Sequence, residues 1–153
     1  FGWAPRNLRP NDEIAVVTFA GDAVTTLQPT AIGQLRPPGT ATPDPRHTRL
    51  LPVLDQLTTF PATRCRSALV VIGDGRFSDL PADSASGTQA LYDAGIDEVA
   101  LLVPGRTDTP EEWLQVFPSA PAQVFDGRSP DATGLVIAQQ LARWTGQDLT
   151  RST

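Results

Sequence analysis

The sequence is short of the residues that build disulfides, zinc sites and membrane spans. It holds one cysteine, Cys65, one histidine, His47, and no methionine among its 153 residues. A single cysteine excludes an internal disulfide and a cysteine-based zinc site, and a single histidine excludes a site with several histidines. No apolar run approaches the roughly 20 residues that a membrane-spanning helix needs. This composition leaves the cellular compartment open.

Basic charge is also scarce. The chain carries 12 Lys and Arg against 17 Asp and Glu, which gives a net charge of −5 and a pI near 4.7. The arginines do not form a run, so the sequence argues against nucleic acid as a partner. A hydrophobic content of 40% is ordinary for a globular protein, and the length predicts a single domain, residues 1–153.

The most informative stretch of the sequence is SALVVIGDGRFSD, from residue 67 to residue 79. Its apolar, β-branched run, residues 68–72, predicts a strand covered on both faces at the centre of a parallel sheet. Two glycines flank Asp74 and allow a sharp turn, which places this carboxylate at the carboxyl end of the strand. Ligands of open α/β sheets bind at that end. Ser78 and Asp79 follow within reach of the same rim.

Hydrophobic periodicity and turn residues predict the remaining elements. The expected strands are residues 13–20, 23–27, 68–72, 97–103 and 122–125, and the expected helices are residues 49–59, 81–94, 110–117 and 130–145. Residues 28–45 form a long proline-rich loop. The alternation after the first hairpin predicts an α/β fold with a doubly wound, mostly parallel sheet, one antiparallel edge strand and helices on both faces.

Four segments in this order resemble the von Willebrand factor type A (VWA) domain. EIAVVTFAGDAVTTL is similar to the second and third strands of that family, and HTRL at residues 47–50 resembles its Gly-Gly-Thr-x-Leu. VVIGDGRFSD is similar to its apolar strand followed by Thr-Asp-Gly, and DAGIDEVALLV resembles its Ala-Gly-Ile-x-Val-x-x-Val strand. The resemblance covers essentially the whole chain and implies a three-layer, Rossmann-like fold without enzymatic activity.

The resemblance also implies a function. Such domains usually hold Mg²⁺ or a similar hard cation in a metal-ion-dependent adhesion site, where an acidic residue of a partner protein completes the coordination. By this match Thr48 would be a hydroxyl ligand and Asp74 a carboxylate ligand, which are the oxygen donors that a hard cation prefers. The surrounding partner-binding rim would consist of Asp22, His47, Ser78 and Asp79.

The sequence also differs from the family pattern, and these differences predict a truncated domain. The family's first strand, with Asp-x-Ser-x-Ser, is missing; Gly73 replaces the threonine of Thr-Asp-Gly, and Arg46 and His47 replace the paired glycines. We therefore interpret the chain as a VWA-like domain that is truncated at its amino end, with weak or absent Mg²⁺ binding. The missing strand belongs between the strands ending at Phe19 and Ile72. Its loss would leave backbone groups unpaired or force the two strands together.

Each site residue also has a simpler interpretation, and for His47 it is that of a solvated histidine in a loop. Asp74 and Asp22 are suitable turn residues, Thr48 is a suitable N-cap for the helix that follows it, and Ser78 and Asp79 are suitable for starting a helix. Two other functions stay open as alternatives. One is a scaffold domain whose metal site has decayed, and the other is a Rossmann-like nucleotide-binding or hydrolytic enzyme, although the sequence has no phosphate-binding glycine motif.

Overall fold

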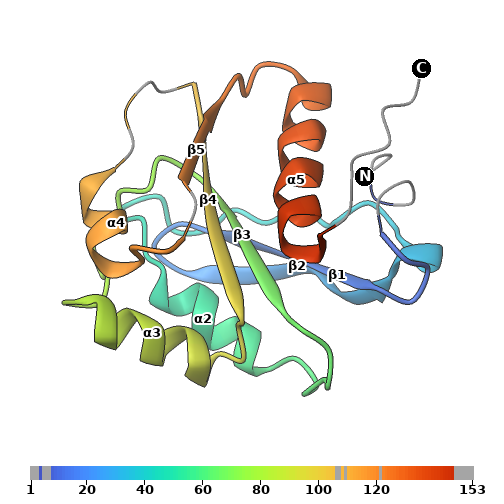
Figure 1. The fold of residues 1–153 in the computed structure, drawn as a ribbon, viewed down its shortest axis with the longest axis horizontal. Helices are drawn as coiled ribbons and strands as arrows, with labels where there is room; N and C mark the ends of the chain where they lie inside the picture. The colour runs from blue at the N-terminus through green and yellow to red at the C-terminus, as the bar shows by residue number, and fades with distance from the viewer. Residues whose placement is uncertain (1–3, 5–7, 106–107, 109, 121, 147–153) are drawn as a thin grey trace.

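The computed structural model describes residues 4, 8–105, 108, 110–120 and 122–146 (Figure 1). Within them the chain forms an α/β fold with a two-stranded and a three-stranded sheet. The elements in chain order are β1 (Glu13–Phe19), β2 (Ala23–Ala31), the 3₁₀ turn η1 (Ile32–Gln34), α2 (Leu51–Thr58), β3 (Ala68–Ile72), α3 (Ser84–Asp93), β4 (Glu98–Pro104), α4 (Glu111–Val116), β5 (Ala122–Phe125) and α5 (Pro130–Thr145). This confirms the predicted fold class.

The first sheet is the antiparallel hairpin β1–β2, which turns at Gly21 and Asp22 as predicted. Strand β2 is longer than expected, because it continues through Pro29 to Ala31. An edge strand tolerates proline where its missing N–H would not serve the ladder. The proline-rich loop returns along this strand, where the Gly39 N–H donates to the Thr26 carbonyl (2.7 Å). The loop therefore shields part of the outer edge of β2.

The second sheet is parallel, in the order β3-β4-β5. Strand β4 lies at its centre, and Val99, Ala100, Leu101, Leu102 and Val103 are all buried. Strand β3 pairs with it in unbroken register from Ala68↔Glu98 to Ile72↔Leu102. The prediction that β3 occupies the centre is wrong: β3 is an edge strand, and Ile72 is 41% exposed. An apolar run shows that a strand is fit for burial, but it does not specify how many neighbours pair with it.

No backbone ladder joins β1 to β3, so the expected single sheet is divided in two. The Gly73 N–H donates to the Leu102 carbonyl (3.1 Å). Because backbone groups of successive strand residues point to opposite edges, Leu69 and Val71 also face β4, whereas Val70 and Ile72 face away from it. The outward backbone groups of Val70 and Ile72 are therefore not paired with a strand among the described residues.

Helices cover both sides of the parallel sheet. In Figure 1, α5 lies on one side, and α3 and α4 lie on the other. The core holds a row of aromatic rings, in which Trp113 packs against Phe77 (5.8 Å between centroids) and Phe117 (4.6 Å). Two large side chains of these helices face solvent: Tyr92 of α3 is 78% exposed and Leu135 of α5 is 54% exposed. No helix in the described part of the chain is long and apolar enough to span a membrane.

Candidate functional site

The carboxyl ends of β1 and β3 meet at one rim of the fold. A Cβ added to Gly73, just after β3, would lie 3.9 Å from the ring of Phe19 at the end of β1. The loop that carries Thr48 is bonded to both sides, since the Arg49 N–H donates to the Ala20 carbonyl (2.8 Å) and the Ser78 N–H donates to the Thr48 carbonyl (2.9 Å). The tertiary structure thus brings together three loops that are distant in the sequence.

Asp74 lies on this rim with an exposed side chain. Its Oδ1 accepts a hydrogen bond from the Arg76 N–H (3.0 Å), and its Oδ2 has no hydrogen bond to any residue that the structure describes. The next residue must be glycine: Gly75 has φ +73°, and an added Cβ would lie 2.6 Å from Leu101 and closer still to Pro110. The turn that presents Asp74 is therefore fixed by packing beneath it.

Thr48 is half-buried in the facing loop. Its carbonyl accepts hydrogen bonds from the backbone N–H and the hydroxyl of Ser78 (2.9 and 3.4 Å). The alternative role of Thr48 as a helix cap is wrong, because the N-cap of α2 is Leu50 and makes no side-chain cap bond. Within the described structure the Thr48 hydroxyl makes no hydrogen bond. It is therefore available to a ligand.

Asp79 has a structural role at the rim. Its two carboxylate oxygens accept hydrogen bonds from the backbone N–H groups of Leu50 (2.6 Å) and Leu51 (3.0 Å), and the Arg49 Nε lies 3.4 Å from Oδ2. A carboxylate is stabilised at a helix N-terminus, where free N–H groups carry partial positive charge. Asp79 thus caps α2 from the segment after β3. The absence of Ser, Thr, Asp and Asn at residues 49 and 50, directly before α2, is a sequence signal that the cap comes from another segment.

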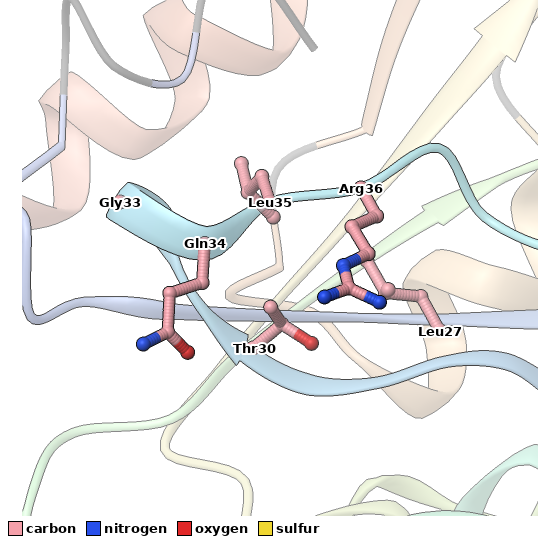
Figure 2. A pocket seen from close by; sticks show the side chains of 6 residues that line it. All are labelled: Leu27, Thr30, Gly33, Gln34, Leu35 and Arg36. Carbon is pink, nitrogen blue, oxygen red and sulfur yellow. The ribbon is translucent and has the colours of Figure 1, made fainter.

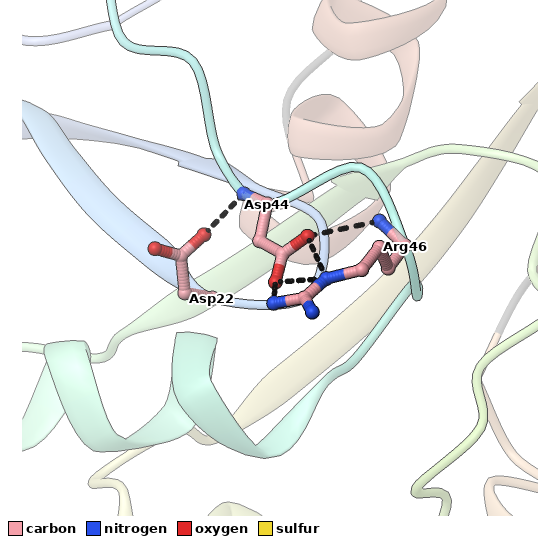
Figure 3. Close-up of polar contacts among 3 residues, drawn as sticks. All are labelled: Asp22, Asp44 and Arg46. Carbon is pink, nitrogen blue, oxygen red and sulfur yellow. Dashed lines mark hydrogen bonds and ion pairs between the residues drawn. The ribbon is translucent and has the colours of Figure 1, made fainter.

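Asp22 belongs to a second polar cluster at the rim, shown in Figure 3. Its Oδ1 accepts a hydrogen bond from the Asp44 N–H (2.8 Å), while the Gly21 N–H donates to the Asp44 carbonyl (2.7 Å). These two bonds fasten the proline-rich loop to the β1–β2 turn. Gly21 permits the close approach, because a Cβ there would lie 3.0 Å from the Asp44 carbonyl oxygen.

Asp44 and Arg46 are rim residues that the sequence analysis missed. The Arg46 guanidinium donates to both Asp44 carboxylate oxygens, with Nε 2.9 Å from Oδ1 and Nη2 2.5 Å from Oδ2. These side-chain hydrogen bonds, followed by one from the Arg46 backbone N–H, hold the pKa of Asp44 below its usual value. The same pairing raises the pKa of Arg46. His47, the next residue, is exposed beside this pair.

The donors at the rim do not make up a complete cation site. Within the described ranges no three His, Cys, Asp or Glu side chains form a group that would hold a metal ion. Thr48 and Asp74 supply two oxygen donors, whereas a hard cation takes about six to eight, partly from water. The described residues therefore supply too few oxygen ligands for a complete binding site for a hard cation.

The α/β fold described above is similar to that of a VWA domain. The chain is similar to the solved structure "von Willebrand factor type A from Catenulispora acidiphila", with a TM-score of 0.60 and 15% sequence identity. The similarity covers 94% of this chain and 36% of that one. No protein-family model matches the sequence, and no curated protein matches it. At this identity the likeness shows the fold alone, and it supports the resemblance found in the four sequence segments.

Proposed function

We propose that this chain is a protein-interaction module that docks a partner through the rim at the carboxyl ends of β1 and β3. The observation that carries the proposal is the hydrogen-bonded convergence of the Asp22, Thr48 and Ser78 loops at this rim. Open α/β sheets bind their ligands at this end, because the loops there project beyond the strands. We propose no catalytic role for the rim residues.

Thr48 and Asp74 form the centre of the proposed docking surface. Each retains a side-chain oxygen without a hydrogen bond to the described residues, and Asp74 is exposed. Asp22, His47 and Ser78 flank them, and Asp79 borders the surface while it holds the start of α2 in place. A free carboxylate and hydroxyl at this surface suit a partner that offers hydrogen-bond donors or shares a cation.

Divalent cation binding by residues 1–153 is proposed to be weak or absent. Two protein oxygens leave most of the coordination shell of Mg²⁺ to water, and such an ion exchanges readily with solvent. Titration calorimetry with Mg²⁺ at neutral pH tests this directly. A dissociation constant in the micromolar range or below would contradict the proposal.

We further propose that the domain is incomplete at its amino end and that a preceding strand belongs between β1 and β3. The unpaired outward groups of Val70 and Ile72 support it. Unpaired backbone groups at a strand edge cost free energy when they are buried, and they promote pairing with other chains when they are exposed. A longer chain that includes residues upstream of Phe1 is expected to unfold at a higher temperature. Equal melting temperatures for both chains would count against the missing strand.

The scaffold alternative is favoured by one specific observation. The carboxylates of Asp74, Asp79 and Asp44 all accept hydrogen bonds from neighbouring backbone N–H groups, so acids on this rim contribute to local structure. If the rim were only structural, its surface oxygens would not contribute to partner binding.

Substitution of Asp74 distinguishes the docking module from the scaffold. Once a partner is in hand, Asp74→Ala and Thr48→Ala are expected to weaken its binding by about tenfold each, which corresponds to about 1.4 kcal/mol. Asp55→Ala is the matched control, because Asp55 is an exposed acid of α2 whose carboxylate makes no hydrogen bond or ion pair with a described residue. Unchanged binding by both rim variants would favour the scaffold.

A further inference from the structure

A groove lies along β2, toward the end of the hairpin that is remote from the rim. Figure 2 shows its walls: Leu27 and Thr30 come from β2, while Gly33, Gln34, Leu35 and Arg36 come from η1 and the segment after it. Its volume is about 630 Å³, and it is open to solvent. Strand β2 starts at the Asp22 turn and runs away from it, so this surface is separate from the proposed docking rim.

The groove combines one cationic group with aliphatic walls. Leu27 and Leu35 are half-buried, and Arg36 and Gln34 are exposed beside them. In the described structure Arg36 takes part in no ion pair, in contrast to Arg46, Arg49 and Arg66, each of which faces a carboxylate. An arginine offers five N–H donors in a planar fork that fits a carboxylate with two parallel hydrogen bonds.

The other polar groups in and beside the groove show which side chains are left to donate hydrogen bonds to a ligand. The Thr30 hydroxyl donates to the Gln28 carbonyl (2.6 Å), so it is left as an acceptor. Asp12, whose carbonyl accepts from the Ile32 N–H next to the groove, already uses its carboxylate to accept from the Arg9 N–H (2.8 Å). The Arg36 guanidinium and the Gln34 amide are therefore the side-chain donors that face an incoming ligand. Arg36 favours an anionic, planar acceptor, and Gln34 offers it a further hydrogen bond.

We propose that this groove binds an acidic peptide segment of a partner protein. One Glu or Asp carboxylate of that segment pairs with Arg36, and its aliphatic neighbours pack on Leu27 and Leu35. The positive charge of Arg36 supplies the complementarity, and the apolar walls add contact area for the aliphatic side chains of the peptide. The proposal does not depend on the function proposed for the rim.

The probe is the capped tripeptide acetyl-leucyl-glutamyl-leucine amide, whose only charge is its glutamate side chain. Titration into ¹⁵N-labelled protein is expected to give saturable shifts of the amide signals of residues 27–36. The matched peptide with glutamine in place of glutamate is expected to bind at least about tenfold more weakly, because it lacks the charge-assisted pair. Equal binding of both peptides, shifts centred on other residues, or no saturable shift would overturn the proposal.

Two protein variants complete the test. Arg36→Gln is expected to reduce affinity for the glutamate peptide by about tenfold or more, and to leave the weak binding of the glutamine peptide unchanged. Arg128→Gln makes the same change of charge at an exposed arginine that follows the carboxyl end of β5, outside the groove. It is expected to bind as the unaltered protein does. An equal loss in both variants would mean that net charge, and not the groove, attracts the peptide.

Discussion

The carboxylate of Asp79 caps a helix that begins 28 residues before it in the chain, through its 3.0 Å contact with the Leu51 N–H. Together with the 2.6 Å contact to the Leu50 N–H, this fastens α2 to the segment that follows β3. The relationship connects the two loops on which the proposed docking rim depends. It also explains how α2 begins without a capping side chain of its own.

Removal of this cap is expected to destabilise the whole domain. Asp79→Ala leaves two helix N–H groups without their acceptor, and the Asp79 side chain is only 11% exposed, so we expect a loss of about 1–2 kcal/mol in the free energy of unfolding. Urea denaturation followed by circular dichroism measures it. Asp55→Ala, an exposed acid on the same helix, should change stability by less than about 0.5 kcal/mol. Equal effects of the two variants would refute the capping role.

Alanine substitutions at Gly75 and Gly95 distinguish the stability cost of backbone strain from that of a steric clash. Both have positive φ, +73° and +72°, but an added Cβ meets Leu101 and Pro110 at Gly75 and nothing within 4 Å at Gly95. Gly95→Ala is expected to cost about 1 kcal/mol from backbone strain alone. Gly75→Ala adds overpacking and is expected to cost about 3 kcal/mol. Thermal melts measure the loss of stability in both variants. A smaller loss than expected for Gly75→Ala would show that Leu101 and Pro110 move to accommodate the added methyl group.

Amide exchange along β3 tests whether its outer edge is open. The N–H groups of Leu69 and Val71 face β4, and those of Val70 and Ile72 face away from it. We expect the second pair to exchange with deuterium at least about tenfold faster than the first. Residue-resolved NMR measures the four rates in one sample. Uniform protection would mean that a partner for this edge is already present in residues 1–153.

The cap of α3 predicts a dependence of stability on pH. The Ser86 N–H donates to the Asp83 carboxylate (2.8 Å), and this hydrogen bond holds the pKa of Asp83 below 3.8 in the folded protein. A depressed pKa gives stability that is complete above the unfolded-state value and is lost as the pH falls through the folded-state value.

The affected window is therefore the acid range, below about pH 5. Melting temperatures between about pH 5 and pH 3 are expected to fall less steeply in Asp83→Asn than in the unaltered protein, because asparagine also caps helices but carries no charge to titrate. Asp55→Asn, which removes an acid that caps nothing, should keep the original slope. An Asp83→Asn slope that matches the unaltered protein would contradict the assignment.

Much of the local structure was readable from the sequence. The apolar runs predicted β1, β3, β4 and β5 within one or two residues, and Ser129 and Gly146 bound α5 as its N-cap and left-handed C-cap. Helix faces were harder to predict. In α5 the buried side includes Val136 and Gln140, whereas Leu135 is exposed, because a helix with apolar residues on several sides fits more than one orientation.

The candidate site was only partly readable. Asp74 and Thr48 follow from a strand end and a family-like motif, whereas the bonds of Asp44 to Asp22 and Arg46 arise where the proline-rich loop returns to the first hairpin. No local pattern encodes the distance at which a loop returns. Helix α4 begins at Glu111 with Pro110 as its N-cap, one residue later than the start expected at residue 110.

The sequence by itself determined the order of strands and helices, because hydrophobic period and turn residues act over a few positions of the chain. Only the tertiary structure decided that β1 and β3 stay unpaired, that Asp79 is bonded to α2 and that Arg36 has no acid partner among the described residues. Pairing between distant segments depends on which backbone and side-chain groups meet in space, and that depends on the whole chain at once.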